Sequence, residues 1–293
     1  MINKLREIKH EIGLRLGRNY IKIDYIASKD KLNIYCPHSF EDRTVKTLEM
    51  FMMAFEKAKL DIKGDLHIAL NCEDYPDGRY KTKRTILAYT KKETDKTTLL
   101  MPDFCFLNWK ESGMLDYEQC WKTMVEESKK APEHDTLFWI GNTKTHPTRC
   151  TLCELSEQDE RIEAYGMGWT YSNNKATPTK YISLTDHTQY KYLIDVQGRG
   201  YSGRTKLLMF TGRPLFIAER QWTEFWSKDA VPFVHYVPVK EDLSDLIEKL
   251  DWVENNPDES AKIAKNAQEF AMTHLRREDA INYFAELIIE CSK

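Results

Sequence analysis

The sequence lacks three features that would assign it to a special class of protein. No run approaches the roughly 18 consecutive apolar residues that cross a bilayer, so the 293 residues predict no membrane-spanning helix. Glycine and proline are scarce, at 12 and 10 residues, and 41% hydrophobic with 30% charged residues excludes collagen-like, low-complexity and disordered chains. An excess of positive charge is also missing, because 43 Lys and Arg stand against 46 Asp and Glu. We therefore expect no nucleic-acid partner.

Cysteine is present without the patterns that give it a structural role. The seven cysteines are odd in number and irregularly spaced, which argues against a disulfide framework. Cys150 and Cys153 form one C-x-x-C, but no second pair and no H-x-x-x-H follows, so no metal site is predicted.

The first 20 residues contain scattered basic side chains and no apolar block, unlike a secretory signal, so we expect a cytoplasmic protein. One helical face in this stretch is apolar. It predicts a surface helix, and the alternative is a peripheral contact with anionic lipid at the inner face of the membrane. That face comprises Leu5, Ile8, Ile12 and Leu16.

Predicted strands and helices alternate, which favours an α/β fold. A polar, proline-containing segment at 129–135 separates two such alternations, so we predict domains at 1–132 and 133–293. The first has helices at 39–60 and 116–130 and strands at 65–71, 84–90 and 97–109. The second has strands at 136–141, 190–197, 214–218 and 233–239, a short helix at 205–210, and three closing helices that start at Asp242, Asn256-Pro257 and about Glu278.

A glycine loop follows the predicted strand at 190–197. Gly198, Gly200 and Gly203 satisfy G-x-G-x-x-G, which taken alone indicates an NAD(P)-dependent oxidoreductase. The helix that follows is only about two turns long, and Arg204 and Lys206 place cations where a dinucleotide site relies on backbone amides. These features favour a phosphate held by side-chain charge as well as by N–H groups.

A second basic loop, G-N-T-K-T-H-P-T-R at 141–149, follows the first strand of the same domain. Asn142, Thr143, Lys144 and Thr145 are suitable phosphate donors, and Arg149 is the candidate bidentate one. Two such loops in one domain predict a diphosphate site. Since no D-x-D pair is present to bring a divalent metal, the diphosphate charge falls to Arg204, Lys144 and helix dipoles.

A carboxylate follows the strand at 65–71 in the first domain. Asp74 lies at the end of that strand and is stiffened by Tyr75-Pro76, which suits a general base. The alternative is that Asp74 merely starts a turn.

These segments also carry a resemblance to a known family. Three segments are similar to glycosyltransferase family 90. They are L-T-D-H-T-Q-Y-K-Y-L-I-D-V-Q-G-x-x-x-S-x-R-x-K (184–206), E-F-W (224–226) and V-P-F-V-H-Y-V-P-V-K-E-D-L-S-D-L (231–246). The segments E-D-Y-P (73–76), M-P-D-F-C-F-L-N-W (101–109) and F-W-I-G-N-T-K-T-H-P-T-R (138–149) fall in the family's order. That family contains protein O-glucosyltransferases, fungal capsule-associated xylosyltransferases and bacterial lipopolysaccharide glycosyltransferases.

The resemblance implies a GT-B fold, with an acceptor-side and a nucleotide-sugar-binding Rossmann-like domain, an interdomain cleft and C-terminal helices. It implies metal-independent, inverting transfer of a glucose- or xylose-type sugar from a UDP-sugar to a hydroxyl of a surface glycan or lipopolysaccharide. No cofactor beyond the UDP-sugar donor is implied. In this interpretation the G-x-G-x-x-G match is coincidental.

The resemblance also assigns roles to residues. It makes Asp74 the catalytic base and places the diphosphate on Arg204, beside Gly198 and Ser202. A second phosphate-binding Arg of the family maps to Lys144, or to Thr143 if an insertion is placed differently. Arg149 is available to share this second task. Glu224, His235 and Tyr236 match family positions whose roles are donor binding or packing.

Two departures from the family pattern shape the expectations. Lys144 stands where an Arg is expected, and a Lys cannot fork onto two oxygens, so a non-catalytic nucleotide-sugar-binding homologue is an alternative. Animal members are secretory and disulfide-bonded, whereas no leader or cysteine framework is seen here. A bacterial or viral cytoplasmic enzyme that builds a surface glycan fits better.

Overall fold

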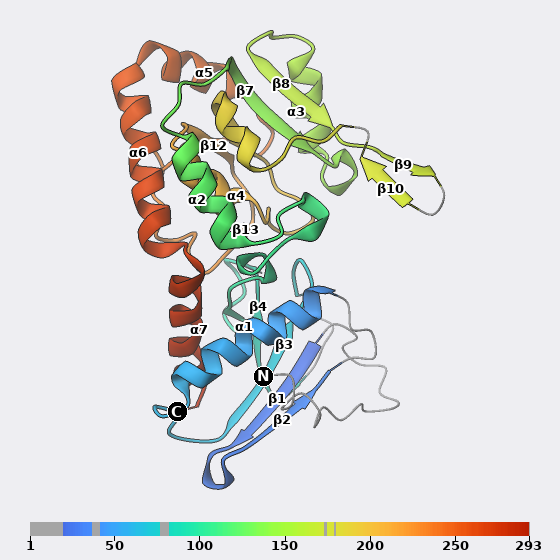
Figure 1. The fold of residues 1–293 in the computed structure, drawn as a ribbon, viewed down its shortest axis with the longest axis vertical. Coiled ribbons are helices and arrows are strands. Elements are labelled where there is room, and N and C mark those ends of the chain that lie inside the picture. Colours follow the sequence, from blue (N-terminus) through green and yellow to red (C-terminus); the bar gives the residue numbers. More distant parts are fainter. Residues whose placement is uncertain (1–19, 37–41, 77–81, 173–174, 179, 293) are drawn as a thin grey trace. The chain divides into compact units, whose positions relative to one another are not determined.

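The computed structural model describes residues 20–36, 42–76, 82–172, 175–178 and 180–292 (Figure 1). The chain forms two compact units, each with its own five-stranded sheet. Unit 1 comprises Met1–Leu107, Trp222–Ser227 and Arg277–Lys293, and unit 2 comprises Asn108–Gln221 and Lys228–Arg276. The predicted α/β fold class is confirmed, and the interdomain cleft stays a prediction.

The sheet of unit 1 has the order β2-β1-β3-β4-β6. β1 pairs antiparallel with both β2 and β3, whereas β3, β4 and β6 are parallel. Alternate residues of β1 are buried, as expected for a strand with one face on a core, while β3 is buried on both faces over most of its length. The strands are β1 (Tyr20–Ile26), β2 (Lys31–Tyr35), β3 (Leu66–Asn71), β4 (Thr85–Ala88) and β6 (Leu99–Leu100).

Two helices far apart in sequence pack together in unit 1: α1 (Asp42–Ala58) and α7 (Arg277–Cys291). Phe51 of α1 meets Phe284 of α7 edge to face, with ring centroids 6.0 Å apart. Phe55 of α1 touches Tyr25 of β1 in the same way at 5.1 Å, which places α1 on the sheet. Tyr283 of α7 donates its hydroxyl proton to Leu100 O. The last helix is therefore part of the core of unit 1.

A short segment from the second half of the chain, Trp222–Ser227, also belongs to unit 1. β13 (Trp222–Thr223) pairs antiparallel with β5 (Lys91–Lys92), and the Trp222 ring stacks on Tyr75 at 4.7 Å.

The sheet of unit 2 is fully parallel, with the order β14-β12-β11-β7-β8. Read from β8, this is 2-1-3-4-5 in chain order. The connection that leaves β7 runs to β8 on one side, and the connection that leaves β11 runs to β12 on the other, so the carboxyl ends of β7 and β11 form the topological switch point. The strands are β7 (His134–Gly141), β8 (Ile162–Gly166), β11 (Tyr190–Asp195), β12 (Leu215–Ala218) and β14 (Val237–Val239).

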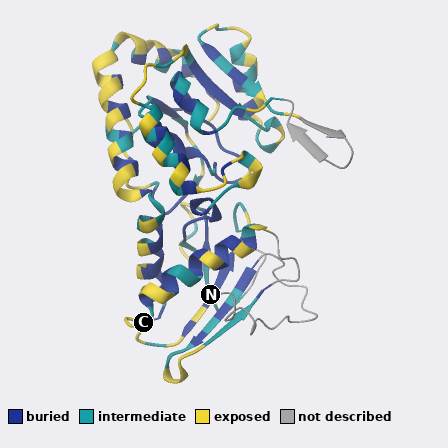
Figure 2. Cartoon of the chain, in the orientation of Figure 1, coloured by how far each residue is buried: buried dark blue, intermediate teal, exposed yellow. Residues whose placement is uncertain are grey.

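Helices cover the sheet of unit 2, and Figure 2 shows its strands largely buried. The core combines apolar side chains of all five strands with Leu152 of α3 and with Leu250 and Val253 of α5. The Trp121 ring of α2 stacks on Phe210 at 5.1 Å, and Gln268 of α6 donates to Phe210 O. The helices are α2 (Tyr117–Glu127), α3 (Thr148–Ser156), α4 (Thr205–Leu208), α5 (Leu246–Asn255) and α6 (Pro257–His274). A separate pair of antiparallel strands, β9 (Trp169–Ser172) and β10 (Lys175–Pro178), also belongs to this unit.

The two units differ from the continuous ranges 1–132 and 133–293. α2 packs within unit 2 through Trp121, and α7 returns to unit 1 through Phe284. Both segments are amphipathic helices, and the position of such a helix in the sequence does not say which sheet its apolar face will cover. The assignment of an acceptor side and a donor side remains a prediction.

Most predicted elements exist, and three were wrong in extent. The run at 97–109 is a two-residue strand, because Pro102 has no N–H for a sheet and Asp103 caps a 3-10 turn by accepting from Cys105 N. The strand at 233–239 begins only at Val237, after a tight turn with Phe233 at φ 56°.

The helix expected at Asp242 begins at Leu246, because the Asp242 carboxylate accepts from Ser244 N in a turn. β1, β2, α3 and β8 were not predicted. The predicted N-terminal apolar face lies outside the described residues. Among the described helices, none is long and apolar enough to cross a membrane.

Substituting Phe284→Ala should lower the free energy of unfolding by about 3–5 kcal/mol, because the side chain is fully buried between α7 and α1. Urea denaturation followed by circular dichroism measures the loss. Glu286→Ala, at an exposed position of the same helix, is the control and should change stability by less than about 0.5 kcal/mol. Equal effects of the two substitutions would contradict the packing of α7 in unit 1.

Candidate functional site

Two loops meet at the carboxyl edge of the unit 2 sheet, in the positions that the sequence predicted. The loop at 141–149 follows β7, and the loop at 196–204 follows β11. The two strands are parallel neighbours, with Leu193 opposite Phe138. The switch point of a parallel sheet is where ligands of such folds bind, so the candidate site lies here.

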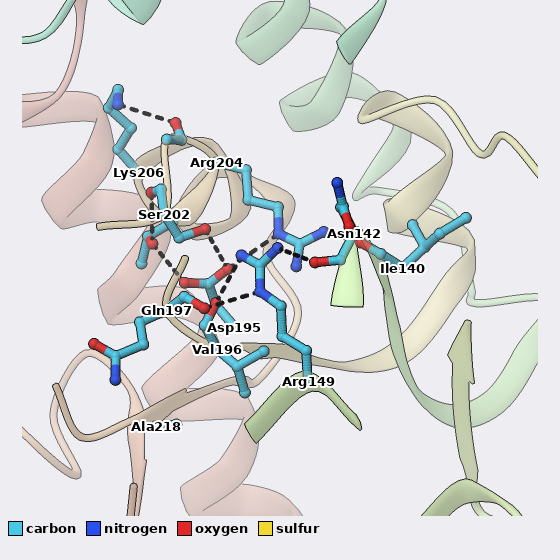
Figure 3. A network of polar contacts seen from close by, with 12 residues as sticks. Ile140, Asn142, Arg149, Asp195, Val196, Gln197, Ser202, Arg204, Lys206 and Ala218 are labelled. Atoms are coloured by element: carbon cyan, nitrogen blue, oxygen red, sulfur yellow. Dashed lines mark hydrogen bonds and ion pairs between the residues drawn. The ribbon is translucent and has the colours of Figure 1, made fainter. Parts of the chain in front are cut away.

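Arg149, in the first turn of α3, ties the two loops together (Figure 3). Its Nε donates to Gln197 O at 2.8 Å, Nη1 to Asn142 O at 3.0 Å and Nη2 to Val196 O at 3.3 Å. Burial, helped by repulsion from Arg204, lowers the pKa of Arg149 to about 10. Each nitrogen of the predicted bidentate phosphate donor is thus engaged with a backbone carbonyl.

Arg204 has one nitrogen that is not engaged. Its Nε donates to Asp195 Oδ1 at 3.0 Å and its Nη1 donates to Ile140 O, the latter on β7. Nη2 is buried and has no hydrogen-bond partner among the residues that the structure describes. Since a buried unpaired donor of a charged group costs stability of about 1–3 kcal/mol or more, this atom points to an acceptor that a ligand supplies.

Asp195, at the end of β11, is the residue that sequence reasoning missed. Its side chain is fully buried, and it accepts from Ser202 and Arg204 on one oxygen and from Thr205 and Arg220 on the other. Burial alone would raise the pKa of Asp195, but Arg220, Arg204 and the two hydroxyls outweigh it and lower the pKa to about 2. The signal was available, because a charged residue inside the apolar run Y-L-I-D-V needs partners nearby.

The ion cluster around Asp195 carries a net positive charge. It comprises the guanidinium groups of Arg149, Arg204 and Arg220 and the carboxylate of Asp195, an excess of two charges within these four residues. The more exposed Glu241 carboxylate lies outside this cluster and accepts from Gln197 Nε2. The guanidinium carbons of Arg149 and Arg204 lie 5.5 and 5.4 Å from the ring centroid of Trp139. An excess of two positive charges in a buried setting suits a ligand with the charge of a diphosphate.

The remaining candidates of the first loop shape a short turn, and only one of them offers an exposed cation. Asn142 Oδ1 accepts from Lys144 N, and the Thr145 hydroxyl donates to Asn142 O, both at 2.9 Å. The side chains of Asn142 and Thr145 are therefore used in their own turn, whereas that of Lys144 is exposed.

The glycine loop is built for close packing. A Cβ at Gly198 would lie 3.0 Å from Tyr201 O and 3.4 Å from Arg149 Nη2, so a larger residue would push on the Arg149 clamp. Ser202 donates to Asp195 at 2.7 Å. α4 has only four residues, Thr205–Leu208, unlike the long helix of a dinucleotide fingerprint.

Two predicted site residues belong to unit 1. Asp74 follows β3, is about one-third exposed at 34%, and pairs with Arg43 at 2.9 Å, while Thr90 donates to its backbone oxygen. Arg43 also reaches Cys72 O at 3.4 Å, so it holds the carboxylate against the end of the strand. Glu224 is buried, and its carboxylate accepts from Trp226 Nε1 at 3.3 Å. Its expected role in donor binding stays a prediction.

Two further residues from the family motifs have packing contacts in unit 2. His235 Nδ1 accepts from Val231 N at 2.9 Å, and its ring lies 4.9 Å from that of Phe270. Burial, the larger cause, and the neighbouring His274 lower the pKa of His235, while burial raises the pKa of Tyr236. These contacts favour packing for His235.

Comparison with known proteins gives the family. The profile of Glycosyl transferase family 90 matches residues 9–293, and the chain belongs to this family. Protein O-glucosyltransferase 1 of Rattus norvegicus is 28% identical over 246 residues, covering 78% of this chain and 62% of that protein. The O-glucosyltransferase rumi homolog of Aedes aegypti is 27% identical over 258 residues, covering 80% and 63%. The chain thus spans somewhat under two thirds of these relatives.

Among solved structures, sucrose-phosphate synthase from Thermosynechococcus elongatus is similar, with a TM-score of 0.36 and 14% sequence identity over 59% of this chain and 42% of that one. A TM-score this low carries no weight for function.

His187 gives this region a pH dependence. It is buried, its Nδ1 lies 2.8 Å from Ser183 O, and burial together with Arg204 lowers its pKa to about 4. In the unfolded chain the imidazole takes up a proton near pH 6.5. The free energy of unfolding should therefore fall as the pH drops from 6.5 to 4, by on the order of 3 kcal/mol, since the unfolded state alone binds the proton.

Urea denaturation between pH 7 and pH 4 measures this fall. His187→Gln should remove most of it, whereas His134→Gln, at an exposed histidine of the same unit, should keep it. A wild-type pH dependence in His187→Gln would show that another group is responsible.

Proposed function

We propose that this protein transfers a glucose- or xylose-type sugar from a UDP-sugar to a hydroxyl group, with inversion and without a metal ion. The observation that carries the proposal is the buried Nη2 of Arg204, which has no partner in the described part of the chain and lies within a cluster that has two excess positive charges. A diphosphate supplies an acceptor for Arg204 Nη2 and negative charge that balances the excess positive charge of the cluster. Membership of glycosyltransferase family 90 favours a nucleotide sugar as the source of this diphosphate.

Chemistry without a metal needs another source of charge for the leaving UDP. Arg204 and its neighbouring guanidinium groups offer fixed positive charge at the carboxyl edge of the sheet, which stabilises charge as it develops on the departing diphosphate. The sequence contains no D-x-D pair that would recruit a divalent ion. Both features favour charge stabilisation by side chains.

Inversion requires one base that removes the proton of the acceptor hydroxyl as it attacks the anomeric carbon. Asp74 suits this role, because its carboxylate is partly exposed at the carboxyl end of β3 and fixed by Arg43. The bond from the acceptor oxygen to the sugar forms as the bond to UDP breaks, and the proton goes to Asp74. One carboxylate is therefore sufficient.

The acceptor that we propose is a hydroxyl of a surface glycan or lipopolysaccharide. The names of the O-glucosyltransferase relatives favour a protein hydroxyl as the second candidate. The proposed location is the cytoplasm, and a peripheral contact with the inner face of the membrane is the alternative.

Arg204→Ala should raise the dissociation constant of UDP about 10- to 150-fold, which corresponds to ~1.5–3 kcal/mol for a hydrogen bond to a charged group. Isothermal titration calorimetry measures it. Arg199→Ala removes an exposed cation from the same loop and should leave UDP binding unchanged. Unaltered binding in Arg204→Ala would remove the diphosphate assignment.

Asp74→Asn should lower transfer at least 10²-fold, the typical contribution of a general base, and leave UDP affinity within twofold. UDP release from UDP-glucose and UDP-xylose is followed with lipopolysaccharide and with a serine-containing peptide as acceptors. The control Asp61→Asn, at an exposed position of unit 1, should behave as wild type. Full activity in Asp74→Asn would contradict the base, and loss of wild-type activity on adding EDTA would contradict the metal-independent mechanism.

A further inference from the structure

The two oxygens of Asp195 hold two different sets of donors. Oδ1 accepts from the Ser202 hydroxyl at 2.7 Å and from Arg204 Nε at 3.0 Å. Oδ2 accepts from the Thr205 hydroxyl at 2.7 Å and from Arg220 Nη2 at 2.9 Å. The carboxylate thus lies between two guanidinium groups, one per oxygen.

Arg220 reaches this place because of the topology. It follows the end of β12, and β12 is the parallel neighbour of β11, so its side chain arrives at the same carboxyl edge as Asp195. Its Nε lies 3.3 Å from Ala218 O and its Nη1 lies 3.4 Å from Thr205 Oγ1. Each nitrogen of Arg220 therefore has a protein acceptor.

The arginines consequently divide into two kinds. Every nitrogen of Arg149 and Arg220 has a protein acceptor, whereas Arg204 keeps one nitrogen without a partner among the described residues. The direction of that nitrogen is set by the two others, which are fixed to Asp195 and to Ile140 O. Because a guanidinium group is planar and rigid, fixing two of its nitrogens fixes the third.

We propose that Asp195 and Arg220 are positioning residues for Arg204, an inference that rests on the proposed binding of a UDP-sugar. Arg220 occupies Oδ2 of Asp195, so that the carboxylate engages Arg204 through Nε alone and leaves Nη2 directed at the diphosphate. Without Arg220, Oδ2 loses its only charged donor among the described residues. The Arg204 guanidinium then turns so that Nη2 reaches Oδ2 and the bond from Nη1 to Ile140 O is given up, because a buried charge requires compensation.

A double-mutant cycle on UDP binding tests this proposal. Arg220→Gln should weaken UDP binding about tenfold in the wild-type chain and less than twofold in the Arg204→Ala background, because its effect passes through Arg204. A merely structural role, or a direct contact of Arg220 with UDP, would give the same loss in both backgrounds. Equal losses, or no loss in the single variant, would overturn the proposal.

Two further variants guard against a loss of folding. Thr205→Val removes a donor from the same oxygen with nearly the same volume, and it should show the same dependence on Arg204 with a smaller loss of about threefold. Arg220→Lys restores the charge at Oδ2 and should recover part of the affinity. Arg213→Gln is the matched control: Arg213 also donates to backbone carbonyls in unit 2, at Thr188 and Lys130, and its removal should leave the UDP dissociation constant unchanged.

Wild-type titration separates this inference from the proposed function. If the wild-type chain binds no UDP, the proposed function fails and the positioning role fails with it. If the wild-type chain binds UDP and the two Arg220→Gln losses are equal, only the positioning role fails.

Discussion

The rest of unit 2 is organised around one ion cluster, the buried carboxylate of Asp195 between Arg204 and Arg220. A charge without solvent is tolerated only when it is paired and hydrogen-bonded, and here four donors share two oxygens. The donors come from the glycine loop, from α4 and from the end of β12, so the pairing of one side chain fixes three segments. The glycine loop is therefore held by these charged hydrogen bonds as well as by the close packing of Gly198.

The cluster depends in turn on the strand order. β7, β11 and β12 are adjacent and parallel, which brings the residues after each of them to one edge. Ile140 O receives Arg204, Gln197 O receives Arg149 and Ala218 O receives Arg220. Backbone carbonyls at strand ends thus hold the cations in place. Under the proposed function, cations fixed in this way stabilise the negative charge that develops on the leaving group.

Sequence reasoning found the parts of this site that a local pattern reveals. The two loops, Arg204 and Ser202 follow from a motif at a strand end, and the structure places them at the carboxyl edge of β7 and β11. Asp195 and Arg220 were not found, because their pairing depends on β12 lying beside β11, which no local pattern contains. The same limit applies to α7, whose apolar face is visible in the sequence although its partner α1 is not.

The contrast between Arg149 and Arg204 shows why residue type alone does not decide a role. Both are arginines at the carboxyl edge, both face Trp139 and both are buried. The nitrogens of Arg149 donate to three backbone carbonyls, whereas Nη2 of Arg204 has no hydrogen-bond partner among the residues described. Closing the two loops and holding an anion are separate tasks with different geometric requirements. Under the proposed function, assigning these tasks to different arginines lets the diphosphate bind and leave while Arg149 keeps the two loops joined.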